Sequence, residues 1–466
     1  MMSERFYAFL IAAIVVAISC SSAYAEQAPG PKDGDSTALT ASQPVAAEEQ
    51  PAAVKLSNEE PAPSGSSKTS SDILGKVRSG YVHPFISITE SFNDNIFYTP
   101  DNKISDFDTL LSPGIWIAVP RLKEREVPAI ETATMTPGGL AMSSFPTKYP
   151  GSYQTYLLYR ADIERYLRNS SENTTSHTLE GAFQYNFRGG LSVDVDDQFL
   201  KSHNPRATSE FSELDKFQSN YFSTVLRYEL GDRTLLRLDY GHYGIQYTSV
   251  DNDFRDRADN AVAAYIFYKL RSRLAVFIEY DYIRVRYEQD VLSDSTEHHV
   301  FAGVRWDITA RSKGMVKVGY GIKDFENPAL ANHGDLILEA QFDHQFTPKR
   351  SVQLTASRKT NETDIAGTDF IISDKLRAAY TQRLATKITG TVDLSYTDDE
   401  YQDVITIGSE TNKLRNKYYN AGAALRYDFR DWLKFDAGLT YSKRVSNFSD
   451  FDYVNKTIFI RLTATL

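Results

Sequence analysis

Opposite charges stand two residues apart just before several short turns of this sequence. The pairs are Arg227 with Glu229, Arg305 with Asp307, and Arg426 with Asp428, and the residues Lys317, Lys434 and Asp436 follow the turns. Side chains two positions apart lie on the same face of a β-strand, so each pair is predicted to point to one side. Mixed charge on the inner wall of a barrel makes a wet, polarised lining that can set a preference for ions or sugars. The alternative is that the pairs neutralise one another and only keep the lumen hydrated.

Histidine and cysteine offer little for catalysis. His298 and His299 are adjacent, so they would point to opposite faces of a strand, and His242, His333 and His344 are scattered. No serine nucleophile motif, glycine-rich phosphate loop or zinc-ligand spacing is present in the sequence. We therefore predict no enzyme, no cofactor and no metal site. A hydrolase built from residues on separate strands would carry no linear motif and stays open as an alternative.

Carboxylates gather in three segments that are predicted to be loops. The residues are Asp251, Asp253 and Asp256; Asp398, Asp399, Glu400 and Asp403; and Asp450 with Asp452. Such clusters can bind divalent cations that bridge lipopolysaccharide, although none has the spacing of a dedicated calcium loop, and a solvated acidic rim is the simpler interpretation. The net charge of −10 argues against a nucleic-acid partner.

The charged pairs belong to a hairpin that repeats along the chain. In its clearest copy, from Leu425 to Tyr441, apolar and polar residues alternate on both sides of a turn at Arg430-Asp431. Further copies surround the turns near residues 231, 310, 347 and 385. One face of each strand is apolar with aromatic residues near its ends, and the other carries charge, glycine and threonine.

This pattern favours a transmembrane barrel over a soluble sandwich. A transmembrane barrel turns apolar side chains toward lipid and polar side chains toward a lumen, with aromatic girdles at both membrane interfaces. The predicted lipid-facing girdle comprises Tyr228, Tyr240, Tyr280, Trp306, Tyr320, Tyr396, Tyr427 and Tyr441. Outer-membrane lipid is then the first predicted partner.

The chain before the barrel divides into two segments. Residues 1–25 are predicted to be a signal peptide, with an apolar run followed by the small-residue cleavage site Ala23-Tyr24-Ala25. A lipid-modified N-terminus at Cys20 is the alternative. Residues 26–78 are rich in Pro, Ala, Ser, Gly and Glu and are predicted to be a disordered periplasmic linker.

The predicted barrel covers residues 79–466, in an up-and-down antiparallel arrangement of about 18 strands (16–18). The predicted strands are 80–90, 108–119, 153–166, 176–187, 190–201, 216–230, 234–247, 258–269, 273–287, 297–308, 314–324, 334–346, 351–361, 371–383, 386–398, 415–429, 432–446 and 453–466. A periplasmic N-terminus places the short turns in the periplasm. The loops near Ser91–Asp106, Lys201–Leu214, Thr248–Arg257, Asp398–Lys413 and Asn447–Asp452 would then lie outside.

Two local features interrupt the pattern. Residues 121–151 form a long, proline-rich periplasmic insertion that could fold into the lumen, dock a periplasmic protein or remain unstructured. In the segments 234–247 and 273–287 the apolar residues change from one alternation phase to the other, at Tyr243 and Ile283. A β-bulge would do this, and so would a rim above the membrane with its own inner packing.

The first hairpin carries a family resemblance. The run Phe92-Asn93-Asp94-Asn95-Ile96-Phe97, followed by Ser105-Asp106 and Leu111-Ser112-Pro113-Gly114-Ile115, resembles the opening of the putative β-barrel porin 2 family. Several members of that family accompany exopolysaccharide or capsule export systems, so the resemblance implies polymer export. It brings no catalytic residues with it.

These observations predict an outer-membrane channel of a Gram-negative bacterium. The favoured function is a passive exit pore for a polysaccharide substrate, working with a periplasmic export partner. A general diffusion porin for small solutes and a structural surface barrel with partner-binding loops are the alternatives.

Overall fold

The computed structural model describes residues 81–119, 152–204, 214–289, 291–309, 311–363, 365, 367–407 and 410–465. The predicted signal peptide, Cys20, the predicted linker and the predicted insertion at 121–151 lie outside these ranges. The strands are β1 (Val82–Asn93), β2 (Asp106–Val119), β3 (Tyr153–Tyr166), β4 (Thr174–Asn186), β5 (Leu191–Asn204), β6 (Asp215–Leu230), β7 (Thr234–Tyr247), β8 (Arg257–Arg271), β9 (Leu274–Tyr287), β10 (Ser295–Thr309), β11 (Ser312–Phe325), β12 (His333–Thr347), β13 (Arg350–Glu362), β14 (Phe370–Ala385), β15 (Ile388–Ile407), β16 (Glu410–Arg430), β17 (Leu433–Ser446) and β18 (Tyr453–Thr465).

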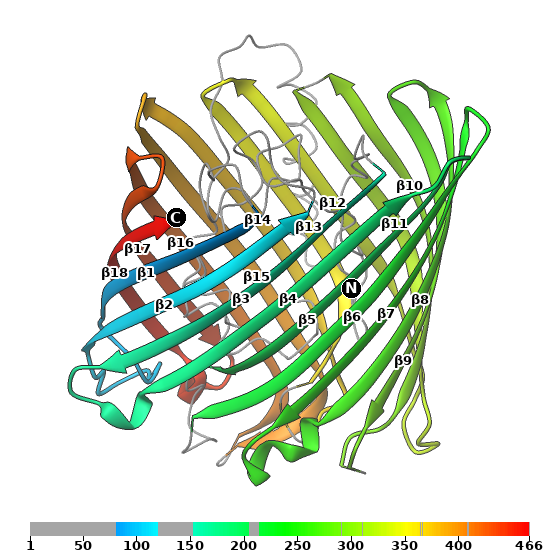
Figure 1. The fold of residues 1–466 in the computed structure, drawn as a ribbon. Helices are drawn as coiled ribbons and strands as arrows, with labels where there is room; N and C mark the ends of the chain where they lie inside the picture. Colours follow the sequence, from blue (N-terminus) through cyan, green and yellow to red (C-terminus); the bar gives the residue numbers. More distant parts are fainter. Residues whose placement is uncertain are drawn as a thin grey trace.

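These strands form one closed antiparallel barrel (Figure 1). Each strand pairs with its neighbours in sequence, and β1 also pairs with β18, from Phe85↔Thr465 to Asn93↔Thr457. Closure leaves the sheet without an edge strand, which is what a strand protein needs in a membrane. The predicted all-β barrel is therefore confirmed at the upper end of the predicted range, with 18 strands in the described residues.

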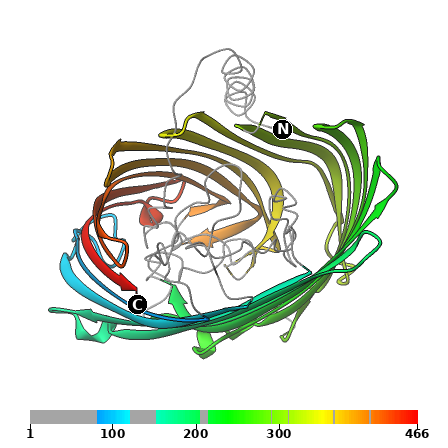
Figure 2. The ribbon, with the colours of Figure 1, turned by 45° about the horizontal axis from the view of Figure 1, so that its top comes forward.

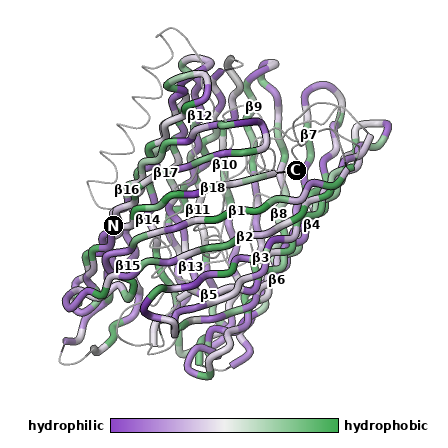
Figure 3. Tube along the Cα trace, turned by 60° about the vertical axis from the view of Figure 1, so that its left-hand side comes forward, coloured by the Kyte–Doolittle hydropathy of each residue, from purple (hydrophilic) through white to green (hydrophobic). Residues whose placement is uncertain are grey.

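The two faces of the wall differ as the alternation predicts. In the β16–β17 hairpin, Leu425 and Leu439 are 52% and 54% exposed on the outside, while Arg426 and Asp436 are buried on the inside. Figure 3 shows the same alternation of hydrophobic and hydrophilic residues along many strands. An outer surface of this kind is suited to lipid rather than to water.

Short and long connections alternate around the barrel. Turns of two or three residues follow β6, β8, β14 and β16, and define the short-turn end; the connections after β1, β3, β7, β9, β11 and β17 are longer and define the long-loop end. Three of the longer connections contain 3-10 helices, at Ser170–Glu172, Val250–Arg255 and Ser449–Phe451. Among the described residues no helix is both long and apolar enough to cross a membrane.

The predicted loop at Asp398–Lys413 is wrong. Strand β15 continues to Ile407 and β16 begins at Glu410, so the two form a tall hairpin with a register shift between Glu400 and Val404. The carboxylates at 398–403 are typical of a loop. The run Val404-Ile405-Thr406-Ile407, however, is β-branched throughout and favours a strand.

The phase change in β7 and β9 does not come from a bulge. The register of β7 with both neighbours runs without a shift, and so does that of β9 with β10. Instead the apolar residues move to the inner face near the long-loop end, where Tyr243, Ile245, Ile283 and Val285 are buried. They belong to two inner apolar clusters, one on β5–β7 and the other on β8–β12. The bulge interpretation is therefore wrong, and inner packing explains the pattern.

Aromatic rings cover glycines on the inner wall. The ladder pairs Phe85 with Gly114, Phe277 with Gly303, and Phe459 with Gly438. A Cβ added at Gly303 would lie 2.3 Å from the Cζ atom of Phe277. Each glycine thus makes room for a ring that lies flat across the neighbouring strand, an arrangement known from designed barrels as aromatic rescue.

The Asn-Asp-Asn motif of the first hairpin joins the ends of the barrel. The Asn95 side chain donates to the carbonyl oxygens of Thr99 and Val454 at 2.8 and 3.1 Å, and Asn455 donates to Asn93 Oδ1 at 2.6 Å. The backbone of Asp94 donates to Lys456 O at 3.0 Å, and its carboxylate accepts from Lys456 N at 2.6 Å. We call these contacts of residues 93–95 with residues 454–456 the seam clasp. It holds the first strand to the last at the long-loop end.

Candidate functional site: the inner wall and its closed corner

Two of the predicted wall charges are buried in ion pairs with carboxylates that were not predicted. Arg227 on β6 pairs with Asp194 on β5. The ammonium of Lys317 lies 2.7 Å from Glu279 Oε1 and 3.1 Å from Glu339 Oε2. These three carboxylates, which sequence reasoning missed, lie on the same inward alternation of neighbouring strands, so strand parity was the signal that could have found them.

Arg426 and Asp436 are the two predicted residues that the structure brings together. The Nε atom of Arg426 lies 2.7 Å from Asp436 Oδ1, and a second nitrogen donates to Oδ2 at 3.2 Å. Their strands place them directly opposite each other. This bidentate contact fixes the guanidinium and neutralises both charges inside the wall.

The other predicted wall charges are less enclosed. Asp428 and Lys434 are partly buried and stand opposite each other in the β16–β17 ladder. Arg305 is also partly buried, with its guanidinium carbon 5.4 Å from the centre of the Phe267 ring. Glu229 is exposed near the turn after β6, and the side chain of Asp307 lies outside the described part of the protein. Their role in a lumen remains a prediction.

The predicted aromatic girdle lies on the outer alternation of its strands. Tyr228, Tyr240, Tyr280 and Tyr320 are exposed, and Trp306, Tyr396, Tyr427 and Tyr441 are partly exposed. Three of these rings bond to polar neighbours: Tyr280 Oη lies 2.8 Å from His298 Nδ1, Tyr240 donates to Asn260 at 2.9 Å, and Tyr396 donates to Asp398 at 3.0 Å. Tyrosine with an apolar body and a bonded hydroxyl suits a membrane interface. That these rings meet lipid headgroups stays a prediction.

The two adjacent histidines point to opposite sides, as predicted. His298 contacts the outward ring of Tyr280, whereas His299 is buried with its Nε2 atom 3.0 Å from Glu297 Oε2. The described residues contain no group of three or more His, Cys, Asp or Glu side chains that could hold a metal ion.

Several loop carboxylates bond to the protein itself. Asp256 accepts a hydrogen bond from Tyr247 N at 2.6 Å, and Asp452 accepts one from Ser446 N at 2.7 Å. In the tall hairpin, Asp398 pairs with Arg415 at 2.7 Å and Asp399 accepts from Ser373 at 2.6 Å. These carboxylates therefore end strands and tie them together, which leaves less charge for bridging cations than the sequence suggests.

Glu362 joins two distant parts of the wall. On β13 it lies 2.5 Å from the ammonium of Lys323 on β11, and its second oxygen accepts a 2.7 Å hydrogen bond from Tyr287 on β9. Lys323 also lies 2.8 Å from Glu297 on β10. We call these contacts of Glu362 with Lys323 and Tyr287 the Glu362 latch. It holds the long-loop end of β13 across the inner face of β9–β11.

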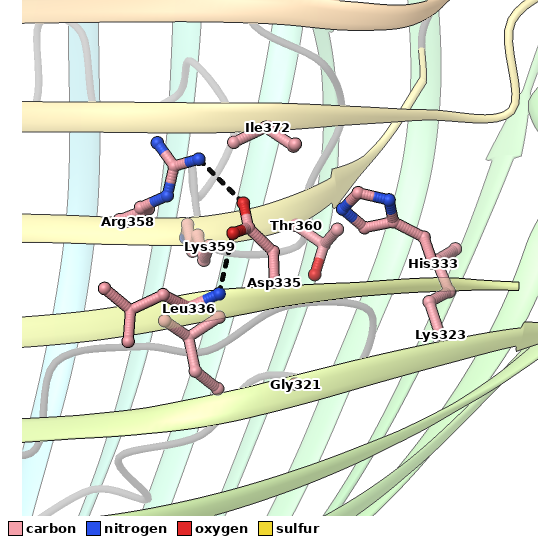
Figure 4. A pocket seen from close by; sticks show the side chains of 10 residues that line it. Gly321, Lys323, His333, Asp335, Leu336, Arg358, Lys359, Thr360 and Ile372 are labelled. Carbon is pink, nitrogen blue, oxygen red and sulfur yellow. Dashed lines mark hydrogen bonds and ion pairs between the residues drawn. The ribbon is translucent and has the colours of Figure 1, made fainter. Parts of the chain in front are cut away.

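A split in the wall allows this crossing. The β12–β13 ladder ends at Leu338↔Arg358, while β12 continues to pair with β11 as far as His333. Arg358 bridges the split, donating to Asp335 at 2.7 Å (Figure 4). It also donates to Asp374 at 2.8 Å. The cavity beside it, which Lys323, His333 and Lys359 also line, holds only about 10 Å³, roughly the space of one water molecule. This site is structural and too small for a solute.

Three long connections pack together next to the latch. They form one buried apolar cluster. Its members are Ile365 before β14 and Ile371 on β14, Tyr401, Ile405 and Leu414 on the tall hairpin, and Phe448 with Phe451 before β18. In Figure 2 the orange tall hairpin lies within the outline of the barrel. We call this cluster the loop cap. Both the loop cap and the latch lie at the long-loop end of the barrel.

Comparisons with known proteins place this geometry among outer-membrane channels. A family model described as putative beta-barrel porin 2 matches residues 154–466. That range begins after the first hairpin, so it confirms the resemblance on other residues than those that suggested it. No curated protein matches the chain.

The chain also matches solved structures of outer-membrane proteins at low similarity. The outer-membrane protein OpdK from Pseudomonas aeruginosa is 9% identical, with a TM-score of 0.44, over 83% of this chain and all of its own. OprD from the same organism is 8% identical, with a TM-score of 0.40, over 84% of this chain and 98% of its own.

Proposed function

We propose that this chain, which belongs to the β-barrel porin 2 family, is a passive outer-membrane exit for an exopolysaccharide. The chain is an outer-membrane channel protein of a Gram-negative bacterium. The polysaccharide cargo, and a periplasmic partner that delivers it, are the parts that we add.

The pairing of charges inside the wall carries the proposal. Arg227, Lys317 and Arg426 are each neutralised by carboxylates on neighbouring strands. Channels that select ions line their pores with rings of one sign of charge. A wall whose cations are cancelled in this way supports the passage of hydrated, uncharged chains such as neutral glycan segments.

The latch and the loop cap also fit export. A pore that is wide enough for a polymer would leak small molecules if it stood open at all times. The Glu362 latch and the buried cluster of the loop cap lie at one end of the passage. We infer that they limit leakage when no polymer is present.

A general diffusion porin for small solutes is the second candidate. Closed barrels of 16–18 strands leave an aqueous channel unless they are plugged. The same 18-stranded wall would serve small solutes equally well. The two functions differ in size selectivity, because a diffusion porin passes monosaccharides and disaccharides without delay.

Solute uptake by proteoliposomes tests the proposal. We expect vesicles containing the barrel to pass neutral oligosaccharides as well as anionic or cationic solutes of equal size, with low basal rates for all of them. Strong discrimination by charge would contradict the argument from the paired wall. Fast, unselective passage of small sugars would favour the diffusion porin. Vesicles without protein are the control.

A further inference from the structure

The long-loop ends of β4 and β5 separate from each other. Their ladder runs only from Asn186↔Ser192 to His177↔Lys201. Beyond it, β4 still pairs with β3 as far as Glu164↔Thr174, and β5 still pairs with β6 as far as Asn204↔Asp215. A contact of 3.2 Å between the hydroxyls of Ser176 and Ser202 bridges the gap. The wall therefore has an opening here, between strands that are continuous on their other sides.

A cavity of about 500 Å³ occupies this opening. Its lining includes Thr174, Ser176 and Ser202, which are buried on the inner alternation of β4 and β5, and the cationic residues Arg165, Lys201 and Lys216. A volume of this size suits a ligand such as a phosphorylated sugar, because ligand sites of about 300–1,000 Å³ are typical of proteins. We call this the β4–β5 cavity.

The cations of the β4–β5 cavity point outward. Lys201 and Lys216 are exposed and lie on the outer alternation of β5 and β6, one on each side of the ladder pair Ser202↔Phe217. Neither lysine forms an ion pair with another described residue. Arg165 is exposed as well, and its Nη1 atom donates to the carbonyl oxygens of Glu164 and Thr174 at 2.7 Å each. These backbone bonds fix the guanidinium at the edge of the cavity without neutralising it.

Two outward arginines elsewhere at the long-loop end are neutralised. Arg286 lies 3.0 Å from Asp294 and 2.9 Å from Glu326, and Arg284 lies 3.7 Å from the same glutamate. Among the described residues, the three cations around the β4–β5 cavity have no such carboxylate partner, so they are available to an anionic ligand.

The height of the cavity on the wall selects the kind of ligand. Directly along β4 from the cavity, toward the short turns, His177 bonds with Tyr159 at 3.0 Å, and Leu179 and Phe183 follow on the exposed outer face. This order, apolar side chains, then tyrosine and histidine, then cations and hydroxyls, follows that of a membrane leaflet from acyl chains to headgroups.

We propose that the β4–β5 cavity binds the phosphorylated sugar headgroup of an outer-leaflet glycolipid. Lys201, Lys216 and Arg165 would hold phosphate, while Thr174, Ser176 and Ser202 would hydrogen-bond the sugar hydroxyls. The inference rests on the proposed outer-membrane function together with the predicted topology, in which the long-loop end faces outside the cell. It does not depend on the cargo of the channel.

Native mass spectrometry of the detergent-solubilised full chain with lipid A tests this site. We expect Lys201→Ala/Lys216→Ala to weaken lipid A binding at least tenfold, and Lys201→Arg/Lys216→Arg to restore most of it. The matched control, Arg284→Ala/Arg286→Ala, removes two outward cations that are already paired and should bind as the wild type does. The heat-dependent gel shift of folded barrels confirms that each variant is folded.

Two results would overturn the site. One is equal lipid A binding by the wild type and the Lys201→Ala/Lys216→Ala variant. The other is full displacement of lipid A by inorganic phosphate alone, which would assign the cavity to a free anion. A separate experiment tests the orientation. In Val250→Cys, an exposed position in the connection after β7 carries a thiol, and an impermeant thiol reagent should label it on intact cells. Secretion assays test the cargo. Failure of the predicted orientation or of the proposed cargo can therefore be distinguished from failure of the lipid site.

Discussion

Tyr287 on β9 donates a 2.7 Å hydrogen bond to Glu362 on β13, a strand four positions further around the barrel. Neighbouring strands in a sheet lie about 4.8 Å apart, so the two residues could not meet along an evenly curved wall. The contact exists because β13 leaves its ladder with β12 at Arg358 and leans inward. At the long-loop end, β13 is thus joined to β9 across the inner face of the barrel.

Weakening the latch should widen the passage. In Glu362→Gln the amide keeps a hydrogen bond to Tyr287 but loses the charge that holds Lys323, so β13 is freed to return toward the wall. We expect a larger single-channel conductance and longer open times in planar bilayers. Glu410→Gln, at an exposed position of the tall hairpin, is the control and should behave as the wild type does. Identical conductance of the two variants would show that the latch does not limit the pore.

The buried pair Arg426–Asp436 should be costly to break from one side. Removing one partner of a buried, hydrogen-bonded ion pair typically costs about 3–5 kcal/mol, because the other charge is left without compensation. We expect Arg426→Ala to lower the free energy of unfolding by about that amount, and Arg426→Leu/Asp436→Leu to cost much less. Urea unfolding in lipid vesicles measures both. If the double variant lost as much unfolding free energy as the two single leucine variants together, the result would contradict the pairing.

A methyl group at Gly303 should destabilise the wall, because it would overlap the Phe277 ring. Overpacking of this kind costs typically about 1–3 kcal/mol. Gly303→Ala should therefore unfold at a lower urea concentration, and Phe277→Leu in the same chain should recover part of the loss. Gly244→Ala is the control, since its added Cβ would meet nothing within 4 Å. Equal midpoints for the two alanine variants would argue against the ring-on-glycine packing.

The seam clasp should govern closure of the barrel. Asn95 is fully buried, and its side-chain amide reaches from the first hairpin to β18. Asn95→Ala removes the hydrogen bonds of this amide to the carbonyl oxygens of Thr99 and Val454, although Val454 O keeps a 3.0 Å bond from Lys103 Nζ. Leaving a buried polar group unsatisfied costs about 1–3 kcal/mol. We expect slower refolding into vesicles and a lower unfolding midpoint. The heat-dependent gel shift measures both. Asp101→Ala, exposed in the same connection, should leave both unchanged.

The faces of the wall follow from the sequence because each strand meets two different environments. Alternation at Leu425, Arg426 and Tyr427 assigns one side to the outside and the other to the inside, and it also yields the number of strands. The His298-His299 pair resolves in the same way. Period two is a local property, so it needs no knowledge of which strand lies beside which.

The partners of the wall charges follow only in part. Asp194, Glu279 and Glu339 lie on the inward alternation of their strands, but their contacts depend on register, and register depends on the length of each connection. The Glu362 latch is harder to predict from the sequence, because its contacts form only when β13 leans inward. The tall hairpin was missed because carboxylates normally indicate a loop, whereas here Asp398 and Asp399 are bonded to Arg415 and Ser373.

The first hairpin shows what a motif alone leaves out. Asn93, Asp94 and Asn95 carried the family resemblance, yet nothing in their spacing indicates a contact with residues about 360 positions later. The structure assigns them to the seam between β1 and β18. A motif of this kind identifies a way of closing a barrel and carries no information about cargo.

Secretion by a deletion strain tests the central claim most directly. We expect a strain without this chain to stop releasing its exopolysaccharide and to accumulate polymer in the periplasm, and the wild-type chain supplied from a plasmid to restore release. Normal release by the deletion strain, together with a large and steady conductance of the purified barrel, would contradict the export account and leave a general porin in its place.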